Sequence, residues 1–381
     1  MESHLFLLYI GIMLLLAKAS GLVAKKLGQP EVMGMLIMGV ICGIFLEKLE
    51  IISSIAEIGV VLLMFIAGLE TDVNELKKAL ATSSLVAIMG VLAPLVLVFL
   101  AMYYIFDVNL HYAVALGIIS TATSVSISVQ TLREIGRLKS RQGMIILGAA
   151  IVDDVLGIIA LTAMIGFFAP GAEQAGLGST LLKIAIFVAL VIILAMVARW
   201  FFNKTDSFLR IEDRKMTFSL ALCFLLAFAS EQLGVAAITG AYFAGVILSM
   251  SGQEREISFD INHIASSIFI PIFFISTGMQ VDLGAVSSAL LMGIILFLMG
   301  SIGKLFGCGG GAILTGSNLQ ESFQIGSGMI PRAEVAIIVA NLSERIGFID
   351  NQALSAVIIM VLLSTLVTPF LLKRSFLGAE V

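Results

Sequence analysis

The stretch Leu147-Gly148-Ala149-Ala150-Ile151-Val152-Asp153-Asp154-Val155-Leu156-Gly157 places two adjacent carboxylates inside a long apolar run. The run begins near Met144 and ends near Phe168, so it is long enough to cross a bilayer as a helix. An ionised carboxylate at the centre of such a helix costs roughly 2.5–3.5 kcal/mol on insertion scales. Because packing alone does not call for two of them, the stretch predicts a site for cations, protons or both.

The two acids, Asp153 and Asp154, have different surroundings if the stretch is helical. Successive residues of an α-helix point about 100° apart, so one acid can face a cavity while its neighbour meets another helix. The alternative, for one of the two, is a purely structural pairing with a basic residue.

The composition is that of a polytopic membrane protein. Of the 381 residues, 59% are hydrophobic and 13% are charged, and the mean hydropathy is +1.10. Soluble domains carry about 25% charged residues. The N-terminus has neither a positively charged region nor a small-residue cleavage site, so we interpret the first apolar run as a retained helix. The three cysteines have no metal-binding spacing.

The apolar segments predict an all-α protein with thirteen transmembrane helices. The predicted spans are residues 4–23, 31–46, 51–69, 83–105, 110–132, 142–168, 179–202, 215–231, 233–251, 262–281, 284–306, 320–341 and 353–373.

Lysines and arginines gather on one side of these spans. Of the 22 such residues, sixteen fall on one side, two (Lys48 and Arg345) fall on the other, and four lie within spans. Cytoplasmic loops carry the excess of positive charge. The distribution therefore predicts an N-terminus outside and a C-terminus in the cytoplasm, for a protein of the plasma (inner) membrane.

The third and tenth spans end alike, which indicates an internal repeat. Gly68 and Asp72 close the third span, and Gly278 and Asp282 close the tenth, each after a Phe-rich apolar run. If the seventh span is a linker, each is the third helix of a six-helix half, and the halves have opposite topology. Inverted repeats of this kind are typical of secondary transporters.

The fifth helix of each half carries a signal for interruption. Residues 120–128 contain six hydroxyl side chains, and residues 326–334 contain Gly326, Gly328 and Pro331. Glycine permits unwinding and proline removes a backbone donor. Hydroxyls and freed carbonyls are hard oxygen ligands that suit a small cation. The alternatives are helix packing through small residues, for the first segment, and a simple kink, for the second.

Charged residues within other spans are further candidates. Lys304 either snorkels to the interface or pairs with a buried acid. Arg332 and Glu334 either neutralise each other or nearby helix ends, and we interpret them as structural first. Glu57 and Glu70 in the third span are candidate buried acids, with Glu57 more typical of a scaffold contact than of a transport ligand.

These residues resemble the monovalent cation:proton antiporters of family 2, and most closely the NapA-type sodium/proton antiporters. The matching segments run in order over nearly the whole chain: residues 56–70, 122–125, 146–157, 303–304 and 331–335. The double Asp is the most specific of them. The usual P-R-G-E segment is P-R-A-E here, with Ala333 in place of Gly. The potassium-efflux branch favours Gln-Asp over Asp-Asp, which argues against that branch.

The resemblance implies a fold with two inverted repeats and crossed, discontinuous helices. A scaffold and dimerisation domain would hold residues 1–70 and 215–281, a moving core would hold 83–168 and 284–374, and 179–202 would link them. Carried over residue by residue, Asp154 would be the ion-binding carboxylate, transiently binding Na⁺. Asp153 would pair with Lys304, and the crossover beside the site would hold Thr123 and Ser124.

The resemblance also implies the activity. We expect a secondary active sodium/proton antiporter, in which Na⁺ and H⁺ compete for the Asp pair during alternating access. It would be a transporter rather than an enzyme and a homodimer in membrane lipid, with monovalent cations and protons as its partners, no cofactor and no nucleic acid. The alternatives are a potassium/proton antiporter of the same fold, a sodium-coupled organic-anion symporter and a passive channel. An intramembrane aspartyl protease would need its two acids on separate helices.

Overall fold

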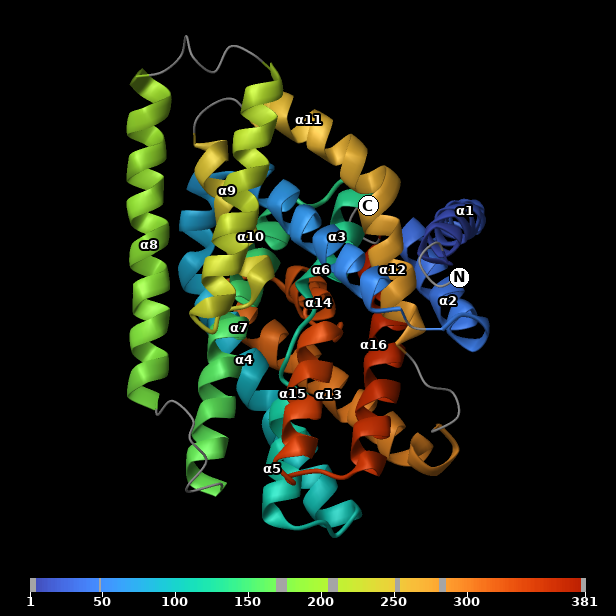
Figure 1. The fold of residues 1–381 in the computed structure, drawn as a ribbon. Coiled ribbons are helices and arrows are strands. Elements are labelled where there is room, and N and C mark those ends of the chain that lie inside the picture. The colour runs from blue at the N-terminus through green and yellow to red at the C-terminus, as the bar shows by residue number, and fades with distance from the viewer. Residues whose placement is uncertain are drawn as a thin grey trace. The chain divides into compact units, whose positions relative to one another are not determined.

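The computed structural model of the chain describes residues 5–47, 49–168, 177–204, 212–250, 254–280 and 286–377. Over these ranges the chain forms helices and no β-strand (Figure 1). Eight of the described helices are long and apolar enough to cross a membrane, and four shorter apolar helices accompany them. The expectation of an all-helical membrane protein is therefore confirmed.

Most of the helices begin and end within about four residues of the predicted spans. Their bounds are α1 Leu5–Lys26, α2 Glu31–Phe45, α3 Glu50–Leu69, α4 Val73–Ile105, α5 Leu110–Ile119, α6 Val125–Glu134, α7 Arg141–Phe168, α8 Leu177–Lys204, α9 Glu212–Gln232, α10 Ala237–Ser249, α11 Glu254–Ile264, η2 Ala265–Phe269, α12 Ile270–Met279, α13 Val286–Leu314, α14 Leu319–Gly328, α15 Glu334–Arg345 and α16 Asn351–Leu377. Lys48 and Asp282, used above for orientation and for the repeat, lie outside the described residues.

The helix pattern differs from the predictions in several places. Helix α4 begins at Val73, ten residues before the predicted start at 83, α11 begins at Glu254, eight residues before 262, and α13 ends at Leu314, eight residues after 306. The turn between α9 and α10 comes later than predicted, because Gly234 adopts a left-handed conformation (φ +78°) there and Val235 N–H donates to the Ser230 carbonyl at 2.8 Å. The predicted tenth span contains a π-helical segment, η2, between α11 and α12. Hydropathy cannot reveal such a segment, because it records how apolar each residue is and not which carbonyl its N–H meets.

Contacts divide the chain into two compact units. Unit 1 comprises Met1–Leu14, Leu49–Lys77 and Ala175–Phe273, and unit 2 comprises Leu15–Lys48, Lys78–Gln174 and Phe274–Val381. The division into a scaffold and a moving core concerns motion, so it stays a prediction.

Unit 1 is built on a close contact between α3 and α10. A Cβ atom on Gly68 would lie 2.1 Å from the Tyr242 carbonyl oxygen, and one on Gly245 would lie 2.2 Å from the Phe65 carbonyl oxygen. Only glycine allows the two backbones to come this close, and small residues play this part in membrane helices generally. Beside this contact, the buried hydroxyls of Thr71 and Tyr242 are hydrogen-bonded at 3.1 Å.

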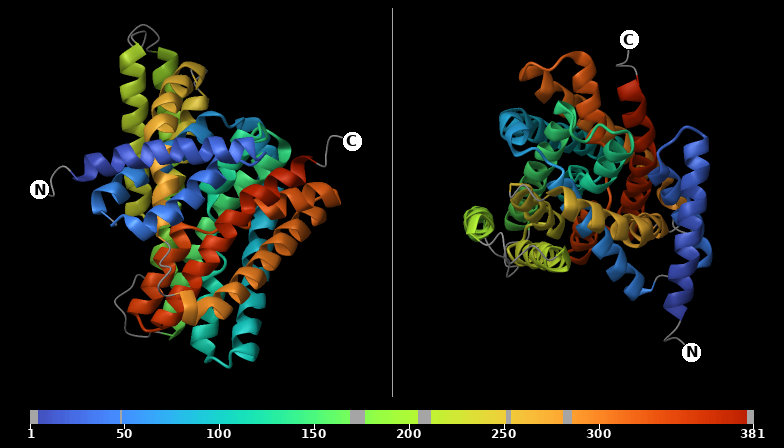
Figure 2. Two further views of the ribbon diagram at one scale, coloured as in Figure 1. Left: turned by 90° about the vertical axis from the view of Figure 1, so that its right-hand side faces the viewer. Right: turned by 90° about the horizontal axis from the view of Figure 1, so that it is seen from above.

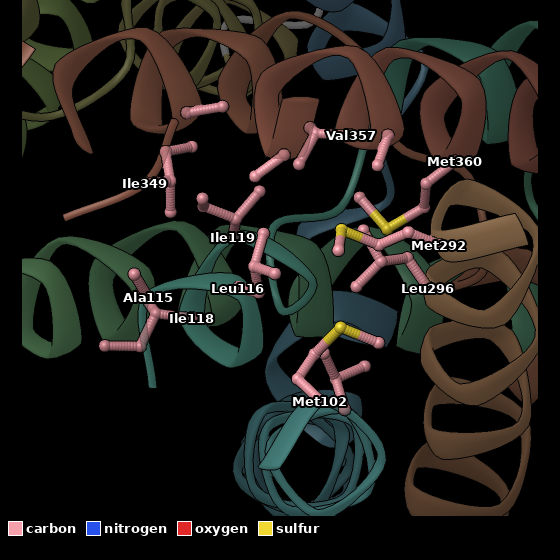
Figure 3. Packing of buried hydrophobic residues seen from close by; sticks show 14 of the residues in the cluster. Met102, Ala115, Leu116, Ile118, Ile119, Met292, Leu296, Ile349, Val357 and Met360 are labelled. Carbon is pink, nitrogen blue, oxygen red and sulfur yellow. The ribbon is translucent and has the colours of Figure 1, made fainter. Parts of the chain in front are cut away.

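Unit 2 holds the interrupted helices and their neighbours. Its long helices α13 and α16 lie side by side, orange and red in Figure 2. An apolar cluster fills the space among α4, α5, α13 and α16, and Met102, Leu116, Leu296 and Met360 each contribute to it from one of these helices (Figure 3). This cluster holds α5, the first half of one interrupted span, against the continuous helices α13 and α16.

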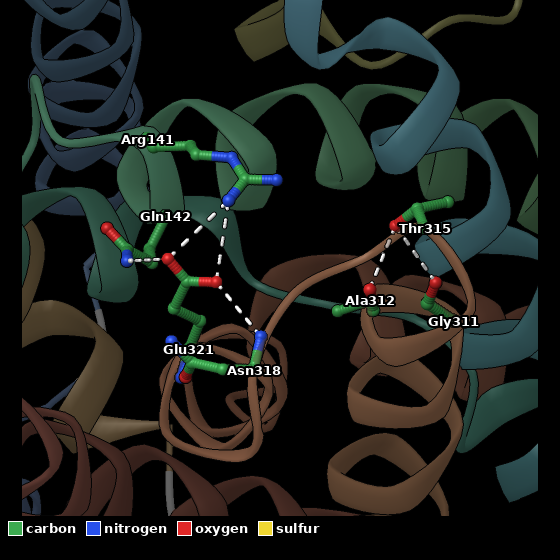
Figure 4. Close-up of polar contacts among 7 residues, drawn as sticks. All are labelled: Arg141, Gln142, Gly311, Ala312, Thr315, Asn318 and Glu321. Carbon is green, nitrogen blue, oxygen red and sulfur yellow. Dashed lines mark hydrogen bonds and ion pairs between the residues drawn. The ribbon is translucent and has the colours of Figure 1, made fainter.

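The first turn of α14 is held by a polar network. Asn318 and Glu321 form a reciprocal capping box, in which each side chain accepts from the other's backbone N–H (Figure 4). The Glu321 carboxylate also accepts from Arg141 at 3.4 Å and from Gln142 at 3.3 Å, both in the first turn of α7. The network therefore attaches α14 to the helix that carries the two adjacent acids.

Candidate functional site

The two adjacent acids lie in the interior of unit 2. Asp153 and Asp154 occupy the middle of α7, and only 2% and 8% of their surfaces are exposed. Two carboxylates at this depth need compensating charge or hydrogen bonds, because removing an ion from water costs several kcal/mol. The surroundings of each acid therefore decide what it can do.

Asp153 is paired with Lys304 of α13. The Lys304 Nζ donates to Asp153 Oδ1 at 2.7 Å, and both side chains are buried, with 0% and 1% exposed. Of the two readings for Lys304, pairing with a buried acid is the one observed. The pair is the one that the resemblance implies, and its part in transport stays a prediction.

Glycines on α13 explain how Lys304 reaches the interior. A Cβ atom on Gly303 would lie 2.4 Å from the Pro94 Cα of α4, and one on Gly307 would lie 2.5 Å from the Met89 carbonyl oxygen. With hydrogen in place of a side chain at both positions, α13 approaches α4 closely. On α4, Gly90 lies beside the lysine side chain, where a Cβ atom would be 3.8 Å from Lys304 Nζ and 3.9 Å from its Cδ.

The two predicted interruptions are present and meet each other. Residues 120–124 separate α5 from α6, and residues 329–333 separate α14 from α15. Ser124 N–H donates to the Pro331 carbonyl at 2.7 Å, and the Ser128 hydroxyl donates to the Gly328 carbonyl at 2.5 Å. The unwound segments therefore supply each other with the partners that a continuous helix would have given them.

Thr123 and Ser124 lie at this meeting point and are buried. The Thr123 hydroxyl is 3.5 Å from the Met329 carbonyl oxygen, at the limit of a hydrogen bond. The Ser124 and Ser126 hydroxyls are 3.0 Å apart. The segment thus concentrates hydroxyl and carbonyl oxygens, which are ligands suited to a hard monovalent cation.

Arg332 neutralises a helix end. Its Nε and Nη2 donate to the Ser120 carbonyl at 2.9 and 2.7 Å, and its Nη1 donates to the Ile330 carbonyl at 2.7 Å. Ser120 is the last residue of the α5 turn, where the helix dipole is negative, so a buried cation is favourable there. Of the two sequence readings, the helix-end one is observed for Arg332; the side chain of Glu334 lies outside the described set.

The two remaining candidates belong to unit 1. Glu57 on α3 is exposed, so the expectation of a buried acid is wrong at this position. The hydrophobic run around Glu57 suggested burial, but the residue is on the outer side of its helix. Glu70 follows the last residue of α3 and is half-buried.

Sequence reasoning missed two residues that bond to the unwound segment. Ser364 and Thr365 of α16 both make hydrogen bonds to the backbone of Arg332. The only signal in the sequence is a pair of hydroxyls in an apolar helix, which does not reveal what they face.

Comparisons with known proteins now bear on this arrangement. The family model of the transmembrane sodium/hydrogen exchanger matches residues 11–377. The chain is 36% identical over 384 residues to the Na(+)/H(+)-K(+) antiporter GerN of Bacillus cereus, covering 98% of this chain and 97% of GerN. It is 38% identical over 380 residues to the probable Na(+)/H(+) antiporter GerT of the same organism, covering 98% of this chain and all of GerT.

The fold is also found in a solved structure. The sodium proton antiporter MjNhaP1 of Methanocaldococcus jannaschii superposes with a TM-score of 0.74 at 17% identity, covering 100% of this chain and 98% of that one. At this identity the likeness shows the fold, and it extends over the whole chain. The chain belongs to the sodium/hydrogen exchanger family of membrane antiporters.

Proposed function

We propose that this protein is a secondary active sodium/proton antiporter in which Na⁺ and H⁺ compete for the carboxylate of Asp154. The observation that carries the proposal is that the two adjacent acids have different surroundings. Asp153 is committed to Lys304 at 2.7 Å, whereas Asp154 is the more exposed of the two. A site that binds either a proton or a cation, and never both, is the simplest basis for exchange.

The meeting point of the unwound segments supports the same proposal. Thr123 and Ser124 provide oxygen atoms in unit 2, which also holds Asp154. In transporters, interrupted helices supply unwound backbone to coordinate ions at membrane depth. The bound cation is the cargo here, so the proposed site needs no resident metal or cofactor.

The ion pair suggests how charge is balanced during exchange. If Na⁺ binding breaks the Asp153–Lys304 pair, Lys304 can release its proton, and two protons are exchanged for one Na⁺. If Lys304 keeps its proton, the exchange is closer to one for one. A Lys304→Ala variant separates these cases, because it removes the second proton and should abolish voltage-dependent exchange. Unchanged voltage dependence in this variant would contradict a proton-carrying lysine.

Purified protein in liposomes tests the assignment directly. Na⁺-driven proton flux is measured for the native chain and for Asp154→Asn, which keeps the size of the side chain and removes its charge. We expect the variant to lose exchange. Asp260→Asn, an identical change at an exposed position of α11, is the matched control and should retain it. Exchange at the native rate in Asp154→Asn would sink the site assignment.

Potassium is the second candidate cation. The name of one relative, the Na(+)/H(+)-K(+) antiporter GerN at 36% identity, gives a specific reason to test it. The same liposomes with K⁺ in place of Na⁺ discriminate the two ions. Proton counterflux also separates an antiporter from a passive channel, and an absence of exchange without an organic anion would favour the symporter.

We further propose the topology and assembly that go with this function. Thirteen spans in two inverted halves would place the N-terminus outside and the C-terminus in the cytoplasm of the plasma membrane, with a homodimer as the unit in the membrane. The positions of the described helices and the distribution of Lys and Arg support this topology. In this scheme spans 4–6 and 11–13 form the moving core. Accessibility of single cysteines placed after Arg374 and in the loop at Asp107 would test the two sides.

A further inference from the structure

Two hydroxyls of α16 hold the backbone of Arg332 from both sides. Arg332 lies between the end of α14 and the start of α15. Its N–H donates to the Ser364 Oγ at 3.2 Å, and its carbonyl accepts from the Thr365 hydroxyl at 2.7 Å. All three residues are buried, with at most 3% exposed. Adjacent residues of a continuous helix thus bind both polar groups of one residue in the unwound segment.

The Thr365 hydroxyl donates to a different segment of the chain and not to its own helix. Serine and threonine hydroxyls in helices commonly bond to a carbonyl one turn earlier in the same helix. Thr368 follows this rule and donates to the Ser364 carbonyl at 2.6 Å, as Thr131 does to the Ile127 carbonyl at 2.8 Å. Thr365 instead donates outside its own helix. Its hydroxyl therefore serves the neighbouring segment and not α16.

The held residue fixes the opposite segment. The Arg332 guanidinium makes two hydrogen bonds to the Ser120 carbonyl, and it lies against Gly300 of α13, where a Cβ atom would be 2.8 Å from Nη2. A guanidinium is planar and its donors are rigidly arranged, so its bonds depend on where its backbone is held. Thus α16 positions Arg332, and Arg332 positions the end of α5.

The same unwound segment carries the proposed cation ligands. Thr123 and Ser124 follow Ser120 within four residues, and Ser124 N–H bonds to the carbonyl of Pro331, the residue before Arg332. A shift of the Arg332 backbone is therefore transmitted to this segment at two points, Ser120 and Ser124. Oxygen ligands bind a cation best when they are already held in place before it arrives.

We propose that Ser364 and Thr365 are positioning residues for cation binding, which hold the Arg332 backbone so that the segment with Thr123 and Ser124 keeps its binding geometry. The inference rests on the proposed function, in which these oxygens belong to the cation site. Neither Ser364 nor Thr365 touches the ion in this scheme. Their effect is on the affinity for the cation more than on the rate of the moving step.

Thr365→Val is the sharpest test. Valine keeps the shape of threonine, which matters because Thr365 also lines a small cavity of about 10 Å³ with Leu36 and Ile337, and a smaller residue would enlarge it. The change leaves the Arg332 carbonyl without this donor. We expect the KM for Na⁺ in liposomes to rise about tenfold while kcat changes less, since an unpartnered buried polar group weakens the arrangement by this order. Thr365→Ser should restore the native KM.

Thr368→Val is the matched control, with the same change on the same buried helix at a hydroxyl that bonds only to its own helix. It should leave the KM for Na⁺ near the native value. Equal KM values in Thr365→Val and Thr368→Val would overturn the proposal, as would a failure of Thr365→Ser to restore binding. If the native chain itself shows no Na⁺/H⁺ exchange, the proposed function is refuted. That outcome differs from one in which the native chain exchanges and the variants have equal KM values, which refutes only the positioning role.

Ser364→Ala covers the case in which Thr365→Val does not fold. It removes the acceptor from the Arg332 N–H and leaves the carbonyl bond intact. Its KM for Na⁺ should rise in the same direction, and a native KM in this variant would overturn the proposal. Folding of every variant is checked by the elution profile of the purified protein in detergent before transport is measured.

Discussion

At the scale of single residues, the interior of unit 2 depends on two buried cations with different partners. Lys304 pairs with a carboxylate, and Arg332 pairs with the carbonyl at a helix end. The first pair joins two ionisable side chains, and in the proposed mechanism it breaks when a cation binds. The second pair joins the guanidinium to backbone carbonyl oxygens, which have no titratable group. In the proposed mechanism, therefore, the bond of Lys304 changes during transport and the bonds of Arg332 stay in place.

Gly300 tests how tightly Arg332 is held. A methyl group there would lie 2.8 Å from the guanidinium Nη2, so Gly300→Ala should displace the side chain and lower the free energy of unfolding by about 1–3 kcal/mol. Gly310, on the same helix, has nothing within 4 Å of its Cβ position. Gly310→Ala should be neutral or slightly stabilising, because alanine favours helix by about 0.5–1 kcal/mol over glycine. Thermal unfolding in detergent compares the two variants. Equal melting temperatures for Gly300→Ala and Gly310→Ala would contradict a close contact between the Arg332 guanidinium and Gly300.

The residues of the candidate site divide into those that the sequence could reveal and those that it could not. The sequence could reveal Asp153, Asp154 and Lys304, because a charged side chain within an apolar run is costly to insert into a membrane and therefore indicates a functional site. Ser364 and Thr365 carry no such signal, since a hydroxyl in a membrane helix is cheap when it bonds to its own backbone. Which way a hydroxyl turns depends on the neighbouring helix, and that is information about tertiary packing.

At the scale of elements, the sequence could predict where the two spans are interrupted, but it could not predict that the two interruptions are hydrogen-bonded to each other. Hydroxyl, glycine and proline residues marked both breaks at 120–124 and 329–333. Their mutual hydrogen bonds follow from two segments 200 residues apart in the chain, such as Ser128 and Gly328, and no local pattern encodes that meeting. The π-helical segment η2 was invisible for the same reason: local apolarity is identical in an α- and a π-helix.

The capping network of α14 gives a prediction about which of its bonds matters. Glu321 both completes a capping box and meets Arg141, whose side chain is 52% exposed. An exposed ion pair contributes about 0–1 kcal/mol, whereas loss of a helix cap costs about 0.5–2 kcal/mol. Glu321→Ala should therefore destabilise the protein more than Arg141→Ala.

The comparison is made by thermal unfolding at low and at high salt. Salt should shrink the small effect of Arg141→Ala and leave most of the effect of Glu321→Ala, because screening acts on the charge pair and not on the backbone cap. A larger loss in Arg141→Ala than in Glu321→Ala would show that the ion pair, and not the cap, holds α14.

At the scale of the whole molecule, family membership and fold agree with the composition. A chain of 59% hydrophobic residues with charges confined to loops and a few interior positions has few architectures open to it, because backbone polar groups in lipid must be satisfied within helices or closed barrels. The positions of most helices could therefore be predicted, whereas the ends of α4, α11 and α13 could not, because these helices extend beyond their apolar runs. The division into a scaffold and a moving core came only from the family resemblance, since residue patterns report which segments are apolar and not which segments move, and it stays a prediction.

Binding of the transported ion should stabilise the whole molecule. A ligand that binds only the folded state at 100 times its Kd adds about 2.7 kcal/mol to the free energy of unfolding. We expect the melting temperature in detergent to rise with NaCl at alkaline pH, where protons compete least, and not with choline chloride at equal ionic strength. Asp154→Asn should remove the difference between the two salts. A persistent Na⁺-specific shift in that variant would place the cation elsewhere.

The π-helical turn at Ala265–Phe269 has a consequence for how this span tolerates changes of length. Such a turn stores one surplus residue, so deleting a residue within it lets the backbone close into a regular α-helix while the flanking segments keep their orientation. A deletion elsewhere in the same span would rotate every side chain beyond it by about 100° and turn a packed face away from its neighbours. The span can therefore lose one residue at this turn, and the shortened chain would present the same faces on either side.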